Sequence, residues 1–153
     1  MDIAEVLKNT SPELFLPDLK SSDKASALAE LVEGLTTGMD IKNPDTILQM
    51  LQSRESLGST AVGPGIAFPH GRTLAVQRLT ILMARSTAGV DFDSEDGNPT
   101  HLFFVLIAPP QDMGHQYIKS LATLIDTVQD ADLRDKLMAA EDYETFCAAL
   151  RGE

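Results

Sequence analysis

The feature that most constrains the fold is an uninterrupted apolar segment from Leu102 to Ala108. A strand with one solvated face alternates apolar and polar residues, whereas a strand covered on both faces is apolar throughout. The segment therefore predicts a central strand with helices on both of its sides. Even when extended to Pro110, the segment is far too short to cross a bilayer, so we expect no direct insertion into a membrane.

Apolar residues at helical spacing predict several helices around that strand. Ser22 or Asp23 caps one helix, and Asn43 followed by Pro44 begins the next. A further helix is expected from about Tyr117 to Gln129, and its core-facing side chains are predicted to be Ile118, Leu121, Ala122, Ile125 and Val128. A last helical pair carries Leu133, Leu137, Phe146 and Leu150.

Short β segments alternate with these helices. Residues 66–68 are predicted to form a strand that Pro69 ends, residues 79–84 a second strand, and residues 90–92 a separate extended piece. Interleaved helices and strands are typical of the α/β class. We therefore predict that residues 1–153 form a single domain with a mixed, mainly parallel sheet, flanked by helices on both faces.

Net charge and cysteine content exclude several classes of function and site. The chain has 12 Lys and Arg residues against 23 Asp and Glu residues, a formal charge of -11, so it should repel nucleic acid. Cys147 is the only cysteine, which excludes an intramolecular disulfide and a zinc site built from several cysteines. The N-terminus lacks the basic and apolar segments of a signal peptide, so we expect a cytoplasmic protein.

The three histidines are the remaining candidates for chemistry. A zinc site made of His70, His101 and His115 is disfavoured, because no two of them are four residues apart and Asp112 is the only nearby carboxylate. We therefore expect no metal. His101, at the start of the buried strand, is interpreted as a structural residue.

His70 lies in a setting that suits phosphoryl chemistry. Pro69 and Gly71 on either side of it leave the imidazole with little steric cover. Three groups are predicted to hold phosphate oxygens: backbone N–H groups of the glycine-rich segment that ends at Gly65, the Ser59 and Thr60 hydroxyls, and the Arg54 guanidinium. The glycines match neither a P-loop nor a dinucleotide-binding fingerprint, so this spacing alone is weak evidence.

The whole segment from Arg54 to Arg72 is more specific. It contains Arg-Glu, then Ser-Thr, then Gly-Pro-Gly-Ile-Ala-Phe-Pro-His, ending at His70. This order and spacing resemble the phosphorylation-site signature of the fructose/mannitol-type (type 2) enzyme IIA domain of the sugar phosphotransferase system (PTS), a group that includes the nitrogen-regulatory IIA-like proteins. The resemblance extends over residues 1–150.

The resemblance implies a phosphocarrier in which His70 accepts a phosphoryl group from the phosphohistidine of an HPr-like protein and Arg54 helps to bind it. In the family, a second histidine near the start of the helix after the long strand completes the site. Here Tyr117 aligns with that position, and His115 lies two residues earlier. His115 is the preferred candidate, because a small change in the preceding loop would bring it into place, and Tyr117 is the alternative. Transfer between two histidines requires no metal or other cofactor.

Three roles are consistent with this reading. Because no IIB or IIC region accompanies the domain, we favour a nitrogen-regulatory IIA protein that acts on a target protein. The alternative is a sugar-specific IIA component, part of a phosphotransferase, that donates phosphate to a IIB domain for sugar uptake. The displaced histidine leaves open a third role, a regulatory binding module that no longer transfers phosphate.

Overall fold

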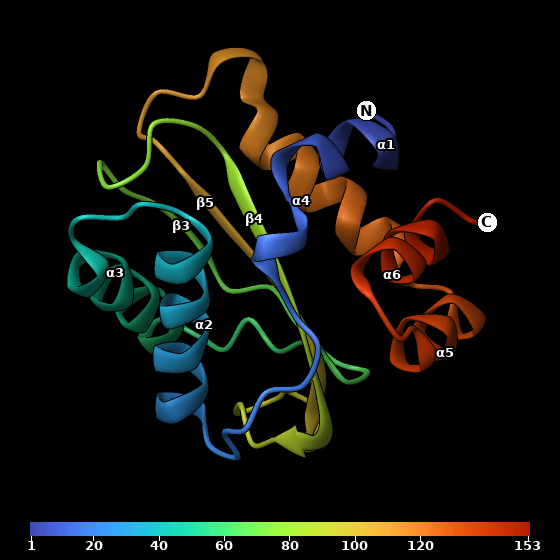
Figure 1. The fold of residues 1–153 in the computed structure, drawn as a ribbon. Coiled ribbons are helices and arrows are strands. Elements are labelled where there is room, and N and C mark those ends of the chain that lie inside the picture. Colours follow the sequence, from blue (N-terminus) through green and yellow to red (C-terminus); the bar gives the residue numbers. More distant parts are fainter.

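The computed structural model describes residues 1–153 and shows a five-stranded sheet between two layers of helices (Figure 1). The strand order is β1-β4-β5-β2, and β3 also pairs with β5. Only β4 and β5 are antiparallel, and the other three pairings are parallel. The predicted α/β class with a mixed, mainly parallel sheet is therefore confirmed. The strands are β1 (Phe15–Leu16), β2 (Ile66–Ala67), β3 (His70–Arg72), β4 (Thr80–Val90) and β5 (Thr100–Ala108).

Strand β5 is the central strand that the apolar segment predicts. Every residue from Leu102 to Ala108 is buried. Alternate side chains of a strand point to opposite faces, and those of β5 enter two separate hydrophobic cores. Leu102, Phe104 and Leu106 belong to one core, and Phe103, Val105 and Ile107 belong to the other. The uniform apolar character of the segment follows from this burial on both faces.

Two helices, α2 (Lys24–Gly38) and α3 (Pro44–Ser56), cover one face of the sheet (Figure 1). Their starts agree with the sequence. The Asp23 carboxylate caps α2 by accepting a hydrogen bond from the N–H of Ser26 at 2.9 Å, and Pro44 occupies the first turn of α3. Helix α3 ends at Ser56, so Arg54 and Glu55 lie in its last turn.

The other face is covered by α1 (Ile3–Val6), α4 (Gln116–Thr127), α5 (Ala131–Ala139) and α6 (Tyr143–Leu150). Both chain termini lie on this side (Figure 1). Three single 3-10 turns complete the helical structure, at Leu7–Asn9, Pro12–Leu14 and Met113–His115. None of the helices combines the length and the apolar composition that are needed to cross a bilayer.

The strand predictions need two corrections. Strand β4 runs on to Val90 and takes in the start of the extended piece predicted at residues 90–92. A register irregularity between Arg85 and Val90 accommodates the polar residues and the glycine that suggested a break. The strand predicted at residues 66–68 is also shorter and covers only Ile66–Ala67. His70 does not follow a strand end, as predicted, but begins a separate strand, β3.

Helix α4 presents a partly different face to the core than its apolar spacing predicts. Of the predicted core residues, Val128 is buried and Leu121 packs against the core, but Ile118 is 53% exposed and Ile125 is 38% exposed. Tyr117, Ser120 and Leu124 are buried instead. The start of the helix accounts for the difference. The backbone is left-handed at Gly114 and His115, and the Asp112 carboxylate accepts a hydrogen bond from the Tyr117 N–H at 2.8 Å. This loop geometry sets the rotation of the helix and turns Tyr117 inward.

Candidate functional site

His70 is half-buried at the start of β3, level with Leu106 of the central strand. Its Nδ1 atom lies 2.6 Å from the carbonyl oxygen of Phe68. A carbonyl oxygen only accepts hydrogen bonds, so Nδ1 carries the hydrogen. In the neutral ring the lone pair is therefore on Nε2, which is the nitrogen able to act as a nucleophile.

Helix α3 packs directly on β3, and Gly71 makes this contact close. A Cβ atom at Gly71 would collide with the Sδ of Met50, so no larger residue fits without a shift of α3 or of the Met50 side chain. Arg54 is one turn further along the same helix. The Gly71–Met50 contact therefore holds the helix that carries Arg54 against the strand that carries His70.

Tyr117 is the aromatic neighbour of His70. The two ring centroids are 6.1 Å apart, with the planes at 49°. The guanidinium carbon of Arg72 lies 4.7 Å from the centroid of the Tyr117 ring, which is a cation–π geometry. Burial raises the pKa of Tyr117 to about 12, although the charges of Arg72 and Arg54 act in the opposite direction. The Arg72 guanidinium therefore lies directly against the ring beside His70.

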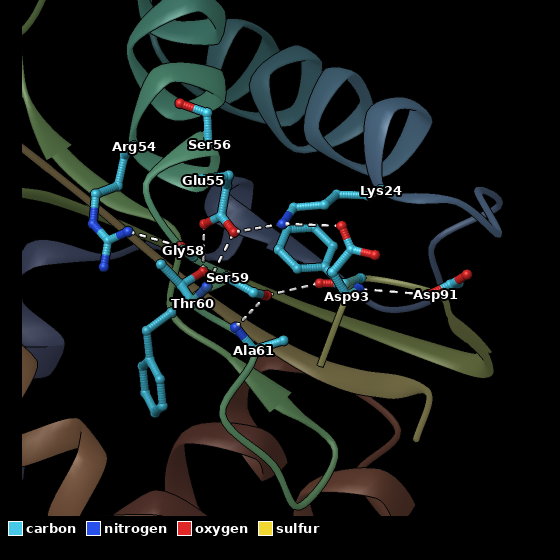
Figure 2. Close-up of polar contacts among 12 residues, drawn as sticks. Lys24, Arg54, Glu55, Ser56, Gly58, Ser59, Thr60, Ala61, Asp91 and Asp93 are labelled. Carbon is cyan, nitrogen blue, oxygen red and sulfur yellow. Dashed lines mark hydrogen bonds and ion pairs between the residues drawn. The ribbon is translucent and has the colours of Figure 1, made fainter. Parts of the chain in front are cut away.

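The loop that follows α3 is organised by Glu55, a carboxylate that is only 7% exposed (Figure 2). It accepts hydrogen bonds from the N–H of Thr60, at 3.0 Å, and from the Thr60 hydroxyl. The Nζ of Lys24, at the start of α2, pairs with the same carboxylate at 3.0 Å. Sequence reasoning missed the part that Glu55 plays, although its place one turn after the buried Leu51 indicates that it faces inward.

The predicted phosphate-binding hydroxyls are used inside the protein. The Ser59 hydroxyl donates to the carbonyl oxygen of Phe92 at 2.9 Å and accepts from the N–H of Ala61 at 3.1 Å (Figure 2). The Thr60 hydroxyl donates to Glu55. The Arg54 guanidinium donates to the carbonyl oxygen of Gly58 at 2.9 Å and has no carboxylate partner, since the ion pairs of the protein involve Lys24 and Arg151.

Two of the predicted site residues, Gly65 and His115, show no contact with His70. The Gly65 carbonyl oxygen accepts hydrogen bonds from the N–H groups of His101 and Leu102. Leu102 is four residues before the level of His70 on β5, a distance of about 13 Å along a strand. The φ angle of +74° at Gly65 shows that it serves the turn before β2. His115 is exposed and makes no ring contact or hydrogen bond with His70.

The structure thus brings together His70 and Tyr117, holds the helix that carries Arg54 against β3, and adds Arg72, which sequence reasoning did not select. Arg72 lies two residues after His70 on the same strand, so both side chains leave β3 on the same side. The signal was present in the Pro-His-Gly-Arg order. That order alone could not show a role for Arg72, because the role depends on the inward-facing Tyr117 ring on which the guanidinium stacks.

Comparisons with known proteins identify the family. The family model for "Phosphoenolpyruvate-dependent sugar phosphotransferase system, EIIA 2" matches residues 8–152. A nitrogen regulatory protein of Bradyrhizobium diazoefficiens is 36% identical over 140 residues, which cover 92% of this chain and 90% of that protein. A PTS fructose-specific EIIA component of Haloferax volcanii is 32% identical over 145 residues, which cover 95% of this chain and 94% of that protein.

A solved structure gives the same answer for the fold. The crystal structure of the nitrogen regulatory protein IIA-Ntr from Neisseria meningitidis superposes with a TM-score of 0.85 at 26% identity, covering 95% of this chain and 99% of that one. The resemblance seen between Arg54 and Arg72 is therefore confirmed over almost the full length. The chain belongs to the EIIA 2 family of the phosphoenolpyruvate-dependent sugar phosphotransferase system, a family of phosphocarrier proteins.

Proposed function

We propose that His70 accepts a phosphoryl group from the phosphohistidine of an HPr-like protein and passes it on or holds it as a signal. One observation carries the proposal. The Nδ1 of His70 lies against the Phe68 carbonyl, which leaves Nε2 as the nucleophile. Arg72, stacked on Tyr117 beside His70, and Arg54, on the helix that packs against β3, have no carboxylate partner. An incoming phosphoryl group meets uncompensated positive charge there, in a protein whose net charge is -11.

The transfer itself is a simple exchange of nitrogen–phosphorus bonds. The Nε2 lone pair of His70 attacks phosphorus, and the bond to the donor imidazole breaks. The donor ring, protonated on its other nitrogen, leaves as neutral imidazole, and the Nδ1 hydrogen of His70 stays with the Phe68 carbonyl. The protein positions the groups and neutralises charge on the transferring oxygens. Arg54 neutralises charge, while Ser59 and Thr60 act by shaping the loop.

Exposed apolar side chains around the site support a protein as the phosphodonor. Leu57 and Leu74 are 84% and 88% exposed, and they lie within three residues of Arg54 and Arg72. Met113 and Ile118, near Tyr117 in the chain, are 88% and 53% exposed. Protein interfaces commonly combine an apolar centre with a polar rim. The HPr-like protein therefore docks over these residues with its phosphohistidine facing His70.

The nitrogen-regulatory role is the one we favour. The nitrogen regulatory relative is 36% identical over 90% of its own length, and the fructose-specific EIIA component is 32% identical over 94% of its length. Phosphorylation adds a charge of roughly -1.5 to -2, which gives a regulated target protein two electrostatic faces to distinguish. Donation to a IIB domain in sugar uptake is the second candidate.

The unpaired, buried Cys147 is consistent with action in the reducing cytoplasm.

Incubation with phosphoenolpyruvate, enzyme I and an HPr-like protein, followed by intact-mass measurement, tests the proposal. We expect the addition of one phosphoryl group that requires all three components. A chase with excess unphosphorylated HPr-like protein should remove it, because the transfer is reversible. A protein that gains no mass is a non-transferring binding module. A second chase with a IIB domain separates the sugar-specific role, which predicts loss of the group to IIB, from the regulatory role.

A further inference from the structure

Tyr117 carries a polar group that the fold leaves unused. The residue is 5% exposed, yet apart from the α4 ladder it makes only the hydrogen bond from its backbone N–H to Asp112. The hydroxyls of buried tyrosines usually find a partner. The fully enclosed side-chain atoms without a partner are the hydroxyls of Thr10 and Thr100, so the unpartnered Tyr117 hydroxyl is open to an approaching atom.

The cation next to this phenol, Arg72, also has few partners within the protein. The Arg72 guanidinium lies over the Tyr117 ring, and its one hydrogen bond to the protein is a long one, 3.4 Å to the carbonyl oxygen of Pro109. No carboxylate pairs with it. The stacking holds Arg72 on the side of β3 from which His70 also projects. A ligand that joins His70 to both groups would satisfy the phenol and the guanidinium together.

The electrostatic surroundings keep the phenol a hydrogen-bond donor. Burial raises the pKa of Tyr117 to about 12, Arg72 and Arg54 act to lower it, and Asp112 acts to raise it. The hydroxyl is therefore protonated throughout the neutral range. A protonated phenol and a guanidinium can both donate hydrogen bonds to phosphoryl oxygens, which only accept them.

We propose that Arg72 and Tyr117 together bind oxygens of the phosphoryl group on His70 and so take the part that a second histidine would otherwise play. The proposal rests on the proposed function, because it assumes that His70 carries the group. The phenol donates one hydrogen bond, Arg72 donates through its planar fork, and neither exchanges a proton with the substrate. The pair is already assembled before the phosphoryl group arrives, so no loop movement of His115 is needed.

Single-turnover transfer from the phosphorylated HPr-like protein, measured for matched variants, tests the pair. Loss of a hydrogen bond to a charged group slows such a step by about ten- to a hundredfold, and we expect this for Tyr117→Phe and for Arg72→Gln. Arg72→Lys should recover part of the rate, because charge returns without the planar fork. The control is Arg151→Gln, which removes one arginine from the C-terminus. Thermal unfolding checks that each variant is folded.

The lifetime of the phosphorylated protein is the second readout, because a merely structural role would not shorten it in a folded variant. We expect faster loss of phosphate from Tyr117→Phe and from Arg72→Gln. Parent-like rates and lifetimes in both variants overturn the proposal. So does slow transfer in His115→Gln together with normal transfer in the Tyr117 and Arg72 variants. If the parent protein takes up no phosphoryl group, the proposed function itself has failed, and that outcome is distinct from either of these.

Discussion

Glu55 accepts two hydrogen bonds from Thr60, one from its backbone N–H and one from its hydroxyl, although the carboxylate is almost wholly buried. Lys24 compensates the charge from the neighbouring helix. The three residues close the loop between α3 and β2, and the same loop presents the Gly58 carbonyl that holds Arg54 (Figure 2). A buried structural carboxylate thus holds the same loop that positions Arg54.

Glu55→Gln should lower both stability and transfer. The amide keeps the shape but leaves Lys24 without its buried partner and cannot accept both bonds from Thr60, so the free energy of unfolding should fall by about 1–3 kcal/mol. Transfer should slow because the Gly58 carbonyl no longer fixes Arg54. Denaturant unfolding and single-turnover transfer measure the two effects. Glu33→Gln, at an exposed position on α2, is the control. An unchanged unfolding midpoint would show that the cluster contributes nothing.

Arg54→Lys should transfer more slowly with nearly normal stability. A lysine keeps the charge but lacks the planar fork that contacts two phosphoryl oxygens, and we expect a loss of about tenfold in rate. The half-buried position at the end of α3 tolerates the change, since only the hydrogen bond to Gly58 is lost within the protein. Transfer at the parent rate would reduce Arg54 to a residue that caps its own helix.

Alkaline titration of the tyrosines tests the burial of Tyr117. The chain has only Tyr117 and Tyr143, and burial raises the pKa of each to about 12. The folded protein therefore keeps these protons above pH 10, where the unfolded chain loses them, so stability should fall as the pH rises from about 10 towards 12. Phenolate absorbance should stay low at pH 10 and rise only near pH 12 or with unfolding. A tyrosine that ionises near pH 10 in folded protein would place one phenol in solvent.

Arg85→Met should destabilise the fold without touching the site. The Arg85 side chain is 8% exposed and donates to the carbonyl oxygens of Pro17, Leu137 and Ala140, which joins β4 to the end of α5. Removing the donors leaves buried carbonyls unpaired, at a cost of about 2–4 kcal/mol. The thermal midpoint should drop clearly, while phosphorylation measured well below that midpoint stays normal. A parallel loss of phosphorylation in folded protein would link Arg85 to function.

Much of the fold follows from local sequence. The apolar run at residues 102–108 is a sufficient signal for a strand buried on both faces, and Asp23 and Pro44 mark helix starts through interactions within one turn. The segment from Arg54 to His70 identifies the family for the same reason, because its residues are contiguous. These signals need no knowledge of how distant segments meet.

Contacts between elements are where sequence reasoning fails. The rotation of α4 depends on left-handed backbone at Gly114 and His115, and spacing alone wrongly places Ile118 inward. That rotation brings the ring of Tyr117 beside that of His70. The role of Arg72 becomes visible only through its stacking on Tyr117.

The proposed function requires that His70 carry the phosphoryl group. The most direct test is fragment mapping by mass spectrometry of the parent, His70→Gln and His101→Gln proteins after incubation with phosphoenolpyruvate, enzyme I and an HPr-like protein. His101 is a fair control because it is a half-buried histidine whose Nδ1 also lies near a carbonyl oxygen, that of Ser86, on the same sheet. We predict one phosphoryl group on His70 in the parent and His101→Gln proteins and none in His70→Gln. A phosphoryl group that persists on folded His70→Gln protein would contradict the account.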